Sequence, residues 1–444
     1  MSKLNTIWQH RYFDEAYLFT LSLISFICWH FANEWLGVVV FSLLLLIISA
    51  KGKSVYFLPI PLFAVPVFRG LLKNVGKIAN TSDVITWSVI ILVTAGVAAI
   101  VYDLVKHVKL KQKGQLFIPW ALVLASMVLS LINTNNIDNS VSGMLIYIFM
   151  LFFYSYFLNL STNNLTKHFT FYAKTILYFT TLTAVMTVLV IVLDKDITRN
   201  IVKKDINIGW SISNNIATYL VYGIPFILYL SIQQTQKFIY YFLVIMLSVV
   251  LFMSGSRAGI GGLLLLAIPS VIFVLNKTNR KQFVTHLMLA ILLTMPFVFV
   301  AIYMNIPEAL YNRLFVQKFF FYYDDRKRLL EIAMECFRQF PVFGSGVFSA
   351  GHYIQAAGRK VFSYHNIFFE ILASLGITGL LAFLYFSIKK YLMLLNNINT
   401  FKTFGLIAIV ASSIFALVDT SYLNPIYLYM LFAFFAFAEK SKGQ

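Results

Sequence analysis

The stretch "RKVFSYHNIFFEILASLGITGL", residues 359–380, contains both features that decide the fold of this chain. It begins with two basic residues and the polar run Tyr364, His365 and Asn366, and it then becomes largely apolar. An apolar run of about 17 residues or more is long enough to cross the hydrocarbon core of a bilayer as a helix. The stretch therefore predicts a membrane span with ionisable side chains at its first turn.

Apolar runs of this length recur along the whole chain. The protein has 444 residues, of which 60% are hydrophobic and 12% are charged, and its mean hydropathy is +0.80. A soluble domain carries about twice that charged fraction. Backbone polar groups cannot be left bare in lipid, and the runs lack the period-two alternation of a membrane β-barrel. We therefore predict an all-α fold: a polytopic integral membrane helical bundle of about 12–14 transmembrane helices, forming a single membrane domain over residues 1–444.

The apolar runs also predict where each membrane span lies. The third run is short and is interrupted by prolines in "FLPIPLFAVPVF". The candidate spans are 16–33, 34–50, 55–69, 84–105, 116–133, 141–160, 170–193, 214–232, 237–254, 258–275, 283–303, 364–387, 401–418 and 424–439.

The short loops between these spans predict the orientation. If the N-terminus is cytoplasmic, the inside loops include "KGKS" (51–54), "KHVKLKQKGQ" (106–115) and "NKTNRKQ" (276–282), which are rich in lysine. The opposite loops "NTNNIDNS" (133–140) and "DTSYLNP" (419–425) contain neither lysine nor arginine. Cytoplasmic loops carry the excess of positive charge, so both termini are expected to be cytoplasmic.

One long segment on the outer side, 304–363, is expected to form an extracytoplasmic loop that contains an amphipathic helix. In "YDDRKRLLEIAMECFRQFPVFGSG" the apolar residues repeat at helical spacing. Asp324 and Asp325 suit a helix N-terminus, and Pro341 suits the helix end. Longer loops cross the membrane regardless of their charge, so the basic residues of this loop do not contradict the orientation.

The composition favours some partners and ligands and excludes others. The net charge of +18 is explained by basic cytoplasmic loops and attraction to anionic lipid headgroups, so no nucleic acid is expected as a partner. The two cysteines, Cys28 and Cys336, do not suggest a disulfide framework. The sequence shows no metal-ligand spacing, Walker loop or convincing dinucleotide motif, and we therefore expect no metal and no cofactor.

Three places on the outer side carry ionisable residues that could do chemistry. Arg257, in "MSGSRAGIGGLL", joins two spans with almost no loop; charge this close to lipid indicates a wet, protein-lined cavity or an arginine that reaches the membrane surface. His365 is either an interface anchor or a general base. Arg326 and Arg328 either bind phosphate or form the solvated face of a helix.

The side chain that would orient His365 is left open by the sequence. Asn366 could orient the imidazole ring or bind a sugar hydroxyl. Glu370, about one turn further along the helix, could also hold the ring.

The C-terminal half resembles the O-antigen ligase and O-antigen polymerase superfamily, membrane glycosyltransferases of bacterial surface polysaccharide assembly. The resemblance lies in "NNIATYLVYGIPF" (214–226), "SGSRAGIGGL" (254–263), "RKRLLEIAMECFRQFPVFGSG" (326–346) and "YHNIFFEILASLGITGLL" (364–381), in that order. It covers roughly residues 205–390, the expected catalytic region. The tryptophan that the family usually has within the loop helix is absent.

The resemblance implies roles for individual residues. Arg257 would hold a pyrophosphate, and His365 would deprotonate the acceptor hydroxyl. The second arginine of the family has two candidates: Arg326, whose spacing from Pro341 is typical of the family, and Arg328; we prefer Arg326. Further substrate contacts are expected from Arg328, Asn366, Tyr364, Arg313 and Lys203.

The resemblance also implies the reaction. The donor would be a glycan linked to undecaprenyl pyrophosphate at the outer face of the bacterial inner (plasma) membrane. The acceptor would be a lipid-linked glycan, in a polymerase, or a lipid A core, in a ligase. Because pyrophosphate is a good leaving group, arginines can replace a metal ion, and a base opposite it gives transfer with inversion. The expected partners are membrane lipids, a chain-length regulator and a flippase.

Two alternatives remain. We favour a repeat-unit polymerase over a ligase, since abundant Ile, Asn, Lys and Phe suggest an AT-rich genome, and a Gram-positive capsule producer has no lipid A core. A flippase or another transporter of lipid-linked oligosaccharides is the alternative from a different class. Transporters of this size usually carry charged residues near mid-membrane, which are nearly absent here, so the enzyme is preferred.

Overall fold

The computed structural model describes residues 2–67, 84–160, 165–193, 201–202, 206–208, 211–234, 237–316, 319–358, 363–418 and 424–441. Helices dominate these residues, and the all-α prediction is confirmed. Two short antiparallel strands are the β structure of the described part; they pair Asn207 with Ile212 and Ile208 with Ser211. The chain divides into two compact units, Met1–Lys109 with Leu160–Leu314, and Leu110–Asn159 with Phe315–Gln444.

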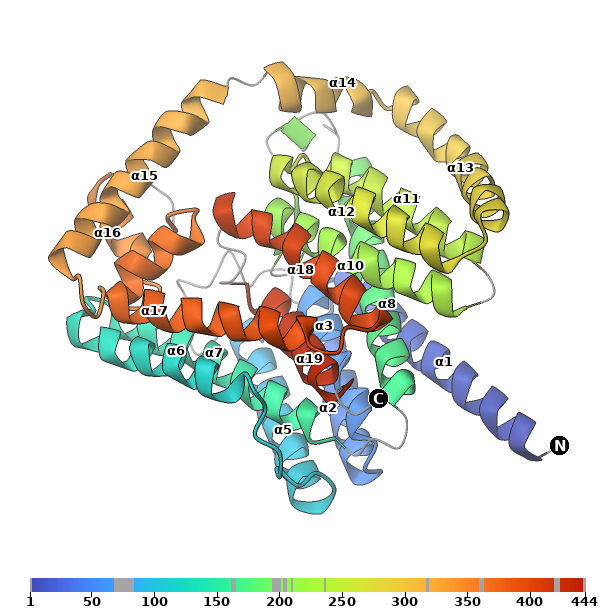
Figure 1. Cartoon of the computed structure of the whole chain (residues 1–444), viewed down its shortest axis with the longest axis horizontal. Coiled ribbons are helices and arrows are strands. Elements are labelled where there is room, and N and C mark those ends of the chain that lie inside the picture. Colours follow the sequence, from blue (N-terminus) through green and yellow to red (C-terminus); the bar gives the residue numbers. More distant parts are fainter. Residues whose placement is uncertain are drawn as a thin grey trace. The chain divides into compact units, whose positions relative to one another are not determined.

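Unit 1 contains most of the N-terminal two thirds of the chain (Figure 1). Its elements are α1 (Ser2–His30), α2 (Glu34–Ala50), η1 (Ser54–Phe57), α3 (Ile60–Ala64), η2 (Val65–Val67), α5 (Val84–Lys106), α8 (Leu165–Val192), β1 (Asn207–Ile208), β2 (Ser211–Ile212), α10 (Ser213–Gln233), α11 (Lys237–Met253), α12 (Arg257–Lys277), α13 (Arg280–Tyr303) and α14 (Ile306–Tyr311).

Unit 2 contains residues Leu110–Asn159 and the C-terminal segment Phe315–Gln444. Its elements are α6 (Phe117–Ser130), η4 (Leu131–Asn133), α7 (Ile137–Leu158), α15 (Phe319–Gln339), α16 (Ala350–Ala356), α17 (Ile367–Leu395), α18 (Thr400–Val418) and α19 (Pro425–Lys440). A π-helical turn, η5 (Asn312–Val316), contains the boundary between the units.

The helices fit a membrane protein by length and composition. Within the described residues, 7 helices are long and apolar enough to cross a bilayer, and α2, α11 and two segments with short 3-10 ends, 54–67 and 117–133, are shorter apolar helices. Each predicted span that the structure describes coincides with helical structure, including the proline-broken 54–67. The total of about 12–14 spans stays a prediction.

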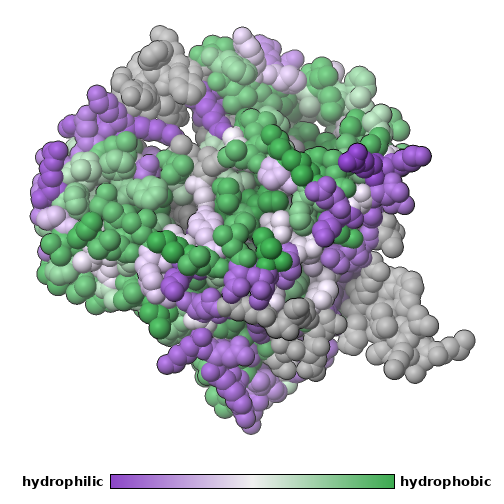
Figure 2. Space-filling view, in the orientation of Figure 1, coloured by the Kyte–Doolittle hydropathy of each residue, from purple (hydrophilic) through white to green (hydrophobic). Residues whose placement is uncertain are grey.

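Helix α10 is the centre of unit 1. It packs against α8, α11 and α12. Of its most apolar window, 89% is buried, against 11% for α13. The exposed apolar side chains of α13 are those expected of a helix that faces lipid, because a soluble protein rarely leaves such a surface bare. Figure 2 shows hydrophobic side chains over most of this part of the visible face.

Helix α17 has the corresponding place in unit 2. It packs along α6 and also contacts α15, α16, α18 and α19, while α7 packs along α19 (Figure 1). Trp120 of α6 contributes to this packing: its ring lies against Phe386 and Phe432, and its indole N–H donates to the carbonyl oxygen of Tyr147 over 3.0 Å. An aromatic core thus joins α6, α7, α17 and α19.

The predicted loop helix is longer than expected, and a second helix follows it. Helix α15 begins at Phe319, so Asp324 and Asp325 lie within it and not at its N-terminus. It ends at Gln339, before Pro341 as predicted. The apolar run Phe319–Tyr323 extends the helix toward its N-terminus. The sequence did not predict this extension, because Asp324 and Asp325 suggested a helix start. A second helix, α16, was not predicted, because its seven residues form only about two turns, too few for a clear helical pattern.

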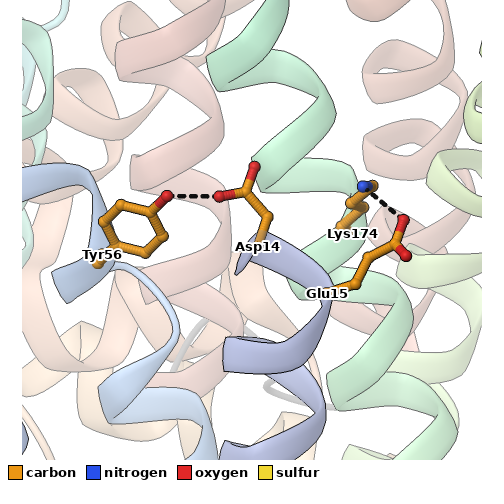
Figure 3. Close-up of polar contacts among 4 residues, drawn as sticks. All are labelled: Asp14, Glu15, Tyr56 and Lys174. Atoms are coloured by element: carbon orange, nitrogen blue, oxygen red, sulfur yellow. Dashed lines mark hydrogen bonds and ion pairs between the residues drawn. The ribbon is translucent and has the colours of Figure 1, made fainter. Parts of the chain in front are cut away.

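A polar cluster joins α1 to its neighbours in unit 1 (Figure 3). Adjacent carboxylates of α1 point to different elements: Asp14 accepts a hydrogen bond from the Tyr56 hydroxyl of η1, and Glu15 pairs with Lys174 of α8 over 2.9 Å. The Lys174 side chain is 6% exposed and that of Glu15 is 38% exposed. A buried ammonium group requires its counter-charge, so this cluster fixes α1 against α8.

We predict that Glu15→Gln lowers the apparent melting temperature of the purified protein by several degrees. The substitution leaves the Lys174 ammonium buried without its counter-charge, at a cost between about 1 kcal/mol for an exposed pair and about 3 kcal/mol for a buried one. Tryptophan fluorescence during heating measures the change. The double variant Glu15→Gln/Lys174→Met, which removes both charges, should recover part of the loss; a single variant that melts like the wild type would contradict the prediction.

Candidate functional site

The segment after α15 is seated in a break of α17. The break lies at Gly376, whose backbone (φ 64°, ψ −162°) is not helical. Segment 340–346 runs along the groups that the break exposes. Four backbone N–H groups bond across it: Ile377 to Pro341 O (2.9 Å), Thr378 to Val342 O (3.3 Å), Ser345 to Ala373 O (2.9 Å) and Gly346 to Ser374 O (3.0 Å). The carbonyl and amide groups that a broken helix leaves unpaired are thereby satisfied.

Glycine is required on both sides of this junction. A Cβ atom on Gly376 would lie 2.4 Å from the carbonyl oxygen of Val342, and a Cβ atom on Gly344 would lie 2.3 Å from the amide nitrogen of Leu375. Both glycines also have positive φ. The dihedral angles of Gly376 belong to a region that is essentially restricted to glycine. Backbone therefore meets backbone here, with no side chain between.

The buried stripe of α15 packs against the start of α17. Leu329, Ile332, Ala333 and Cys336 are buried in one hydrophobic cluster. The other buried members of that cluster are Ala350 and Ile354 of α16, and Tyr364 and Ala373 at the start of α17. Helix α15, which carries Arg326 and Arg328, and the Tyr364–His365–Asn366 turn are thus held together within unit 2.

The two candidate arginines of α15 differ in their surroundings. Both are exposed. Arg328 pairs with Glu331 over 3.0 Å, whereas no described side chain forms an ion pair with Arg326. At 100° per residue, Arg326 lies about 70° from the centre of the buried stripe and Arg328 about 90°, on the opposite side. The two side chains therefore leave opposite edges of the packed face, and the pairing with Glu331 is what distinguishes Arg328 from Arg326.

The Tyr364–His365–Asn366 turn is held by hydrogen bonds on both sides of the histidine. His365 has φ +52°, in the left-handed region that a non-glycine residue rarely adopts. Before it, the amide N–H of Tyr364 donates to Glu370 Oε2 over 2.9 Å. After it, Asn366 caps α17: its Oδ1 accepts from the amide nitrogens of Phe368 (3.0 Å) and Phe369 (3.3 Å).

The side chain of Asn366 makes one further bond, since its Nδ2 donates to the carbonyl oxygen of Leu417 in α18 over 3.0 Å. Tyr364 is 1% exposed. Burial raises the pKa of its phenol, and nearby Cys336 and Glu370 add to the shift. In the structure, Asn366 and Tyr364 thus hold the turn, while His365 between them is half-buried.

The second group of candidate residues surrounds the start of α12 in unit 1. Gly255 has φ +63°, and Ser256 caps α12 by accepting from the amide nitrogen of Gly259 over 3.3 Å. The Ser256 hydroxyl donates to Asn214 Oδ1 over 3.1 Å, and the hydroxyl of Ser213 donates to the carbonyl oxygen of Ser254 over 2.8 Å. Hydrogen bonds therefore join the "SGSR" turn to the first residues of α10.

Two arginines meet at this turn. Arg257 Nη2 donates to the carbonyl oxygen of Arg313 over 2.9 Å, and Arg313 Nε donates to the carbonyl oxygen of Gly255 over 3.4 Å. Arg313 is 4% exposed, and Arg257 is half-buried. Two permanent positive charges beside a helix N-terminus create a positive potential that suits an anion.

The predicted residues thus form two groups. Arg257 and Arg313 come together in unit 1, and Tyr364, His365 and Asn366 lie with α15 in unit 2. Lys203 lies outside the described residues. Across the described residues, no group of three or more His, Cys, Asp or Glu side chains is placed to hold a metal ion.

Some features of these sites were not predicted. The break at Gly376 lies inside a run that the sequence predicts as one continuous span. The hydrogen bond from the Tyr364 amide to Glu370 forms only because the chain turns sharply at His365. The signals that could have revealed them are "SLG" within the apolar run and "FGSG" after the loop helix, since paired glycines mark close approaches of backbone.

We predict that Gly376→Ala destabilises the protein by about 3 kcal/mol or more, because alanine is strained at this φ and ψ and its Cβ meets Val342. The yield of monodisperse protein and its melting temperature measure the effect. Gly261→Ala is the matched control: it lies in α12 with nothing within 4 Å of its Cβ position, and it should melt at or above the wild-type temperature. Equal melting of both variants would refute the role of the break.

A family model described as O-antigen ligase matches residues 241–384, about a third of the chain. The matched part includes α12, α15 and the first two thirds of α17, and with them Arg257, Arg326 and His365. A search of curated proteins found no match. The match to residues 241–384 confirms the resemblance of this chain to the O-antigen ligase and O-antigen polymerase superfamily.

Proposed function

We propose that this protein is a glycosyltransferase of bacterial surface polysaccharide assembly. It transfers a glycan from undecaprenyl pyrophosphate to a sugar hydroxyl at the outer face of the inner (plasma) membrane, with both of its termini in the cytoplasm. The observation that carries this proposal is the O-antigen ligase match, because the matched residues contain both arginine groups and the histidine turn.

The arginines would neutralise the leaving pyrophosphate. The pair Arg257 and Arg313 presents two permanent charges at one helix N-terminus, and charge-assisted hydrogen bonds to phosphate are roughly twice as strong as neutral ones. Arg326, which has no ion-pair partner among the described side chains, is the arginine of α15 that we assign to the donor. Charge that develops on the pyrophosphate is then stabilised by arginines in place of a metal ion.

His365 would act as the general base. Its neutral imidazole takes the proton of the acceptor hydroxyl while that oxygen attacks the anomeric carbon. The bond from this carbon to the pyrophosphate oxygen breaks, and the electron pair leaves with the pyrophosphate. Attack from the side opposite the leaving group inverts the anomeric configuration.

We favour a polymerase, which extends one lipid-linked repeat with another, over a ligase. The support is the composition of the chain, rich in Ile, Asn, Lys and Phe, which suits a Gram-positive capsule producer without a lipid A core. A product ladder from a single lipid-linked glycan substrate would support the polymerase, and a single transfer onto a lipid A core would support the ligase.

We predict that His365→Ala slows glycan transfer by about 10²–10⁴-fold, the usual contribution of a general base. The assay follows transfer from a lipid-pyrophosphate glycan by purified protein in detergent. His352→Ala is the matched control, because His352 is an exposed histidine of α16 in the same unit. Wild-type protein that moves the lipid across a vesicle membrane without forming a glycosidic bond would instead identify a transporter.

We further predict that Arg326→Gln lowers kcat/KM by about 10²-fold, as expected when one charged donor to the transition state is removed. Arg328→Gln should change it by less than about 3-fold, because that side chain is solvent-exposed and already paired with Glu331. The two variants carry the same charge change, so the difference measures position alone. The reverse order would assign the donor to Arg328.

A further inference from the structure

Glu370 lies directly behind the histidine turn, in the first turn of α17. It is 3% exposed, which is rare for an ionisable side chain in an apolar environment. Its Oε2 accepts the amide N–H of Tyr364, the residue before His365. A bond from a carboxyl group to this amide fixes the backbone at the point where the chain enters the left-handed conformation.

Glu370 and Ser374 both line a cavity within unit 2. This cavity has a water-accessible volume of about 40 Å³, and its walls include Trp120 of α6, Tyr147 of α7, Phe348 and Ser374. Within the described part of the chain, neither Glu370 Oε1 nor Ser374 Oγ has a hydrogen-bond partner. The volume is enough for about three water molecules, and a polar pair of this kind is where buried water binds.

The strained backbone of His365 needs support from its surroundings. A left-handed conformation costs a non-glycine residue roughly 1–2 kcal/mol. Asn366 supports the far side of the turn, but its oxygen is used in capping α17 and its Nδ2 bonds to Leu417. Glu370 supports the near side, because its Oε2 accepts the amide N–H of Tyr364 over 2.9 Å. Glu370 therefore fits the role of orienting group that the sequence left open.

We propose that Glu370 is the positioning residue of His365. Its carboxyl group holds the Tyr364–His365–Asn366 turn in its left-handed form, and, when ionised, it stabilises the imidazolium that forms when His365 accepts a proton. Glu370 itself neither touches the substrate nor exchanges a bond in this step. The role of Glu370 in glycan transfer rests on the proposed function. Its electrostatic effect on His365 is independent of that function.

Among the described residues, few other titratable groups lie near this pair. The remaining titratable neighbours are Tyr147 of α7, Cys336 of α15, Tyr353 of α16 and Tyr364. Burial raises the pKa of the Cys336 thiol and of the Tyr353 and Tyr364 phenols, so these stay neutral below pH 8. The arginines of α15 stay charged throughout.

The test compares Glu370→Gln with wild type in two measurements on the full-length protein. The amide oxygen of glutamine can still accept from Tyr364, so the fold is kept while the negative charge is lost. The first measurement is the pH–rate profile of glycan transfer. We expect kcat to fall about 10-fold or more and the acid limb to move to lower pH, because an imidazolium without its counter-charge forms less readily.

The second measurement needs no activity. Nitrogen-15 labelled histidine is followed by NMR from pH 5 to 9, and the signal of His365 is identified by its loss in His365→Asn. In Glu370→Gln this signal should titrate at lower pH than in wild type. If wild-type protein transfers no glycan but this titration still moves, the proposed function fails while the pairing stands.

Glu335→Gln is the matched control, since Glu335 is an exposed carboxylate of α15 in the same unit. It should leave the rate and both pH dependences unchanged. Glu370→Asp keeps the charge and provides a second variant, which should retain a titration closer to wild type than that of Glu370→Gln. A Glu370→Gln protein that is folded and has the wild-type rate and titration would overturn the proposal, because Glu370 would then act in packing alone.

Discussion

The break in α17 at Gly376, with segment 340–346 seated in it, is the constraint on which the rest of unit 2 depends. A continuous helix would offer this segment no free amide or carbonyl groups. With the break, backbone N–H groups of both segments find partners in the other. The end of α15 is therefore held at a definite point of α17, and its buried stripe meets the residues around Tyr364.

The two groups of candidate residues share one local design. In each, a residue with positive φ precedes the residue that caps a helix: Gly255 before Ser256 at α12, and His365 before Asn366 at α17. This geometry turns the chain sharply at the beginning of an apolar helix and places a candidate residue, Arg257 or His365, at the turn. The positive end of a helix dipole is also present at both places, where an anionic substrate would be stabilised.

The positive φ is allowed by glycine at the Gly255 turn, and it is supported by hydrogen bonds at the His365 turn. Gly255 has no steric cost at positive φ, and its missing side chain lets the carbonyl oxygen of Ile201 approach. His365 has no such freedom, and its conformation relies on bonds made by Glu370 and Asn366. A buried carboxyl group beneath a half-buried histidine is thus explained as part of the turn.

The sequence by itself determined the elements and the class of protein. Apolar runs predict helices because lipid leaves the backbone no other partners, and motif order predicted the resemblance to a superfamily that the family match then confirmed. The tertiary structure decided how α15 is attached, where Gly376 interrupts a run that reads as continuous, and that Glu370 bonds to the backbone before His365. It also separated Arg326 from Arg328 by pairing the second with Glu331. Apolar periodicity is a property of neighbouring residues, whereas a helix break is stabilised by partners distant in the chain, so the apolar pattern alone does not reveal it.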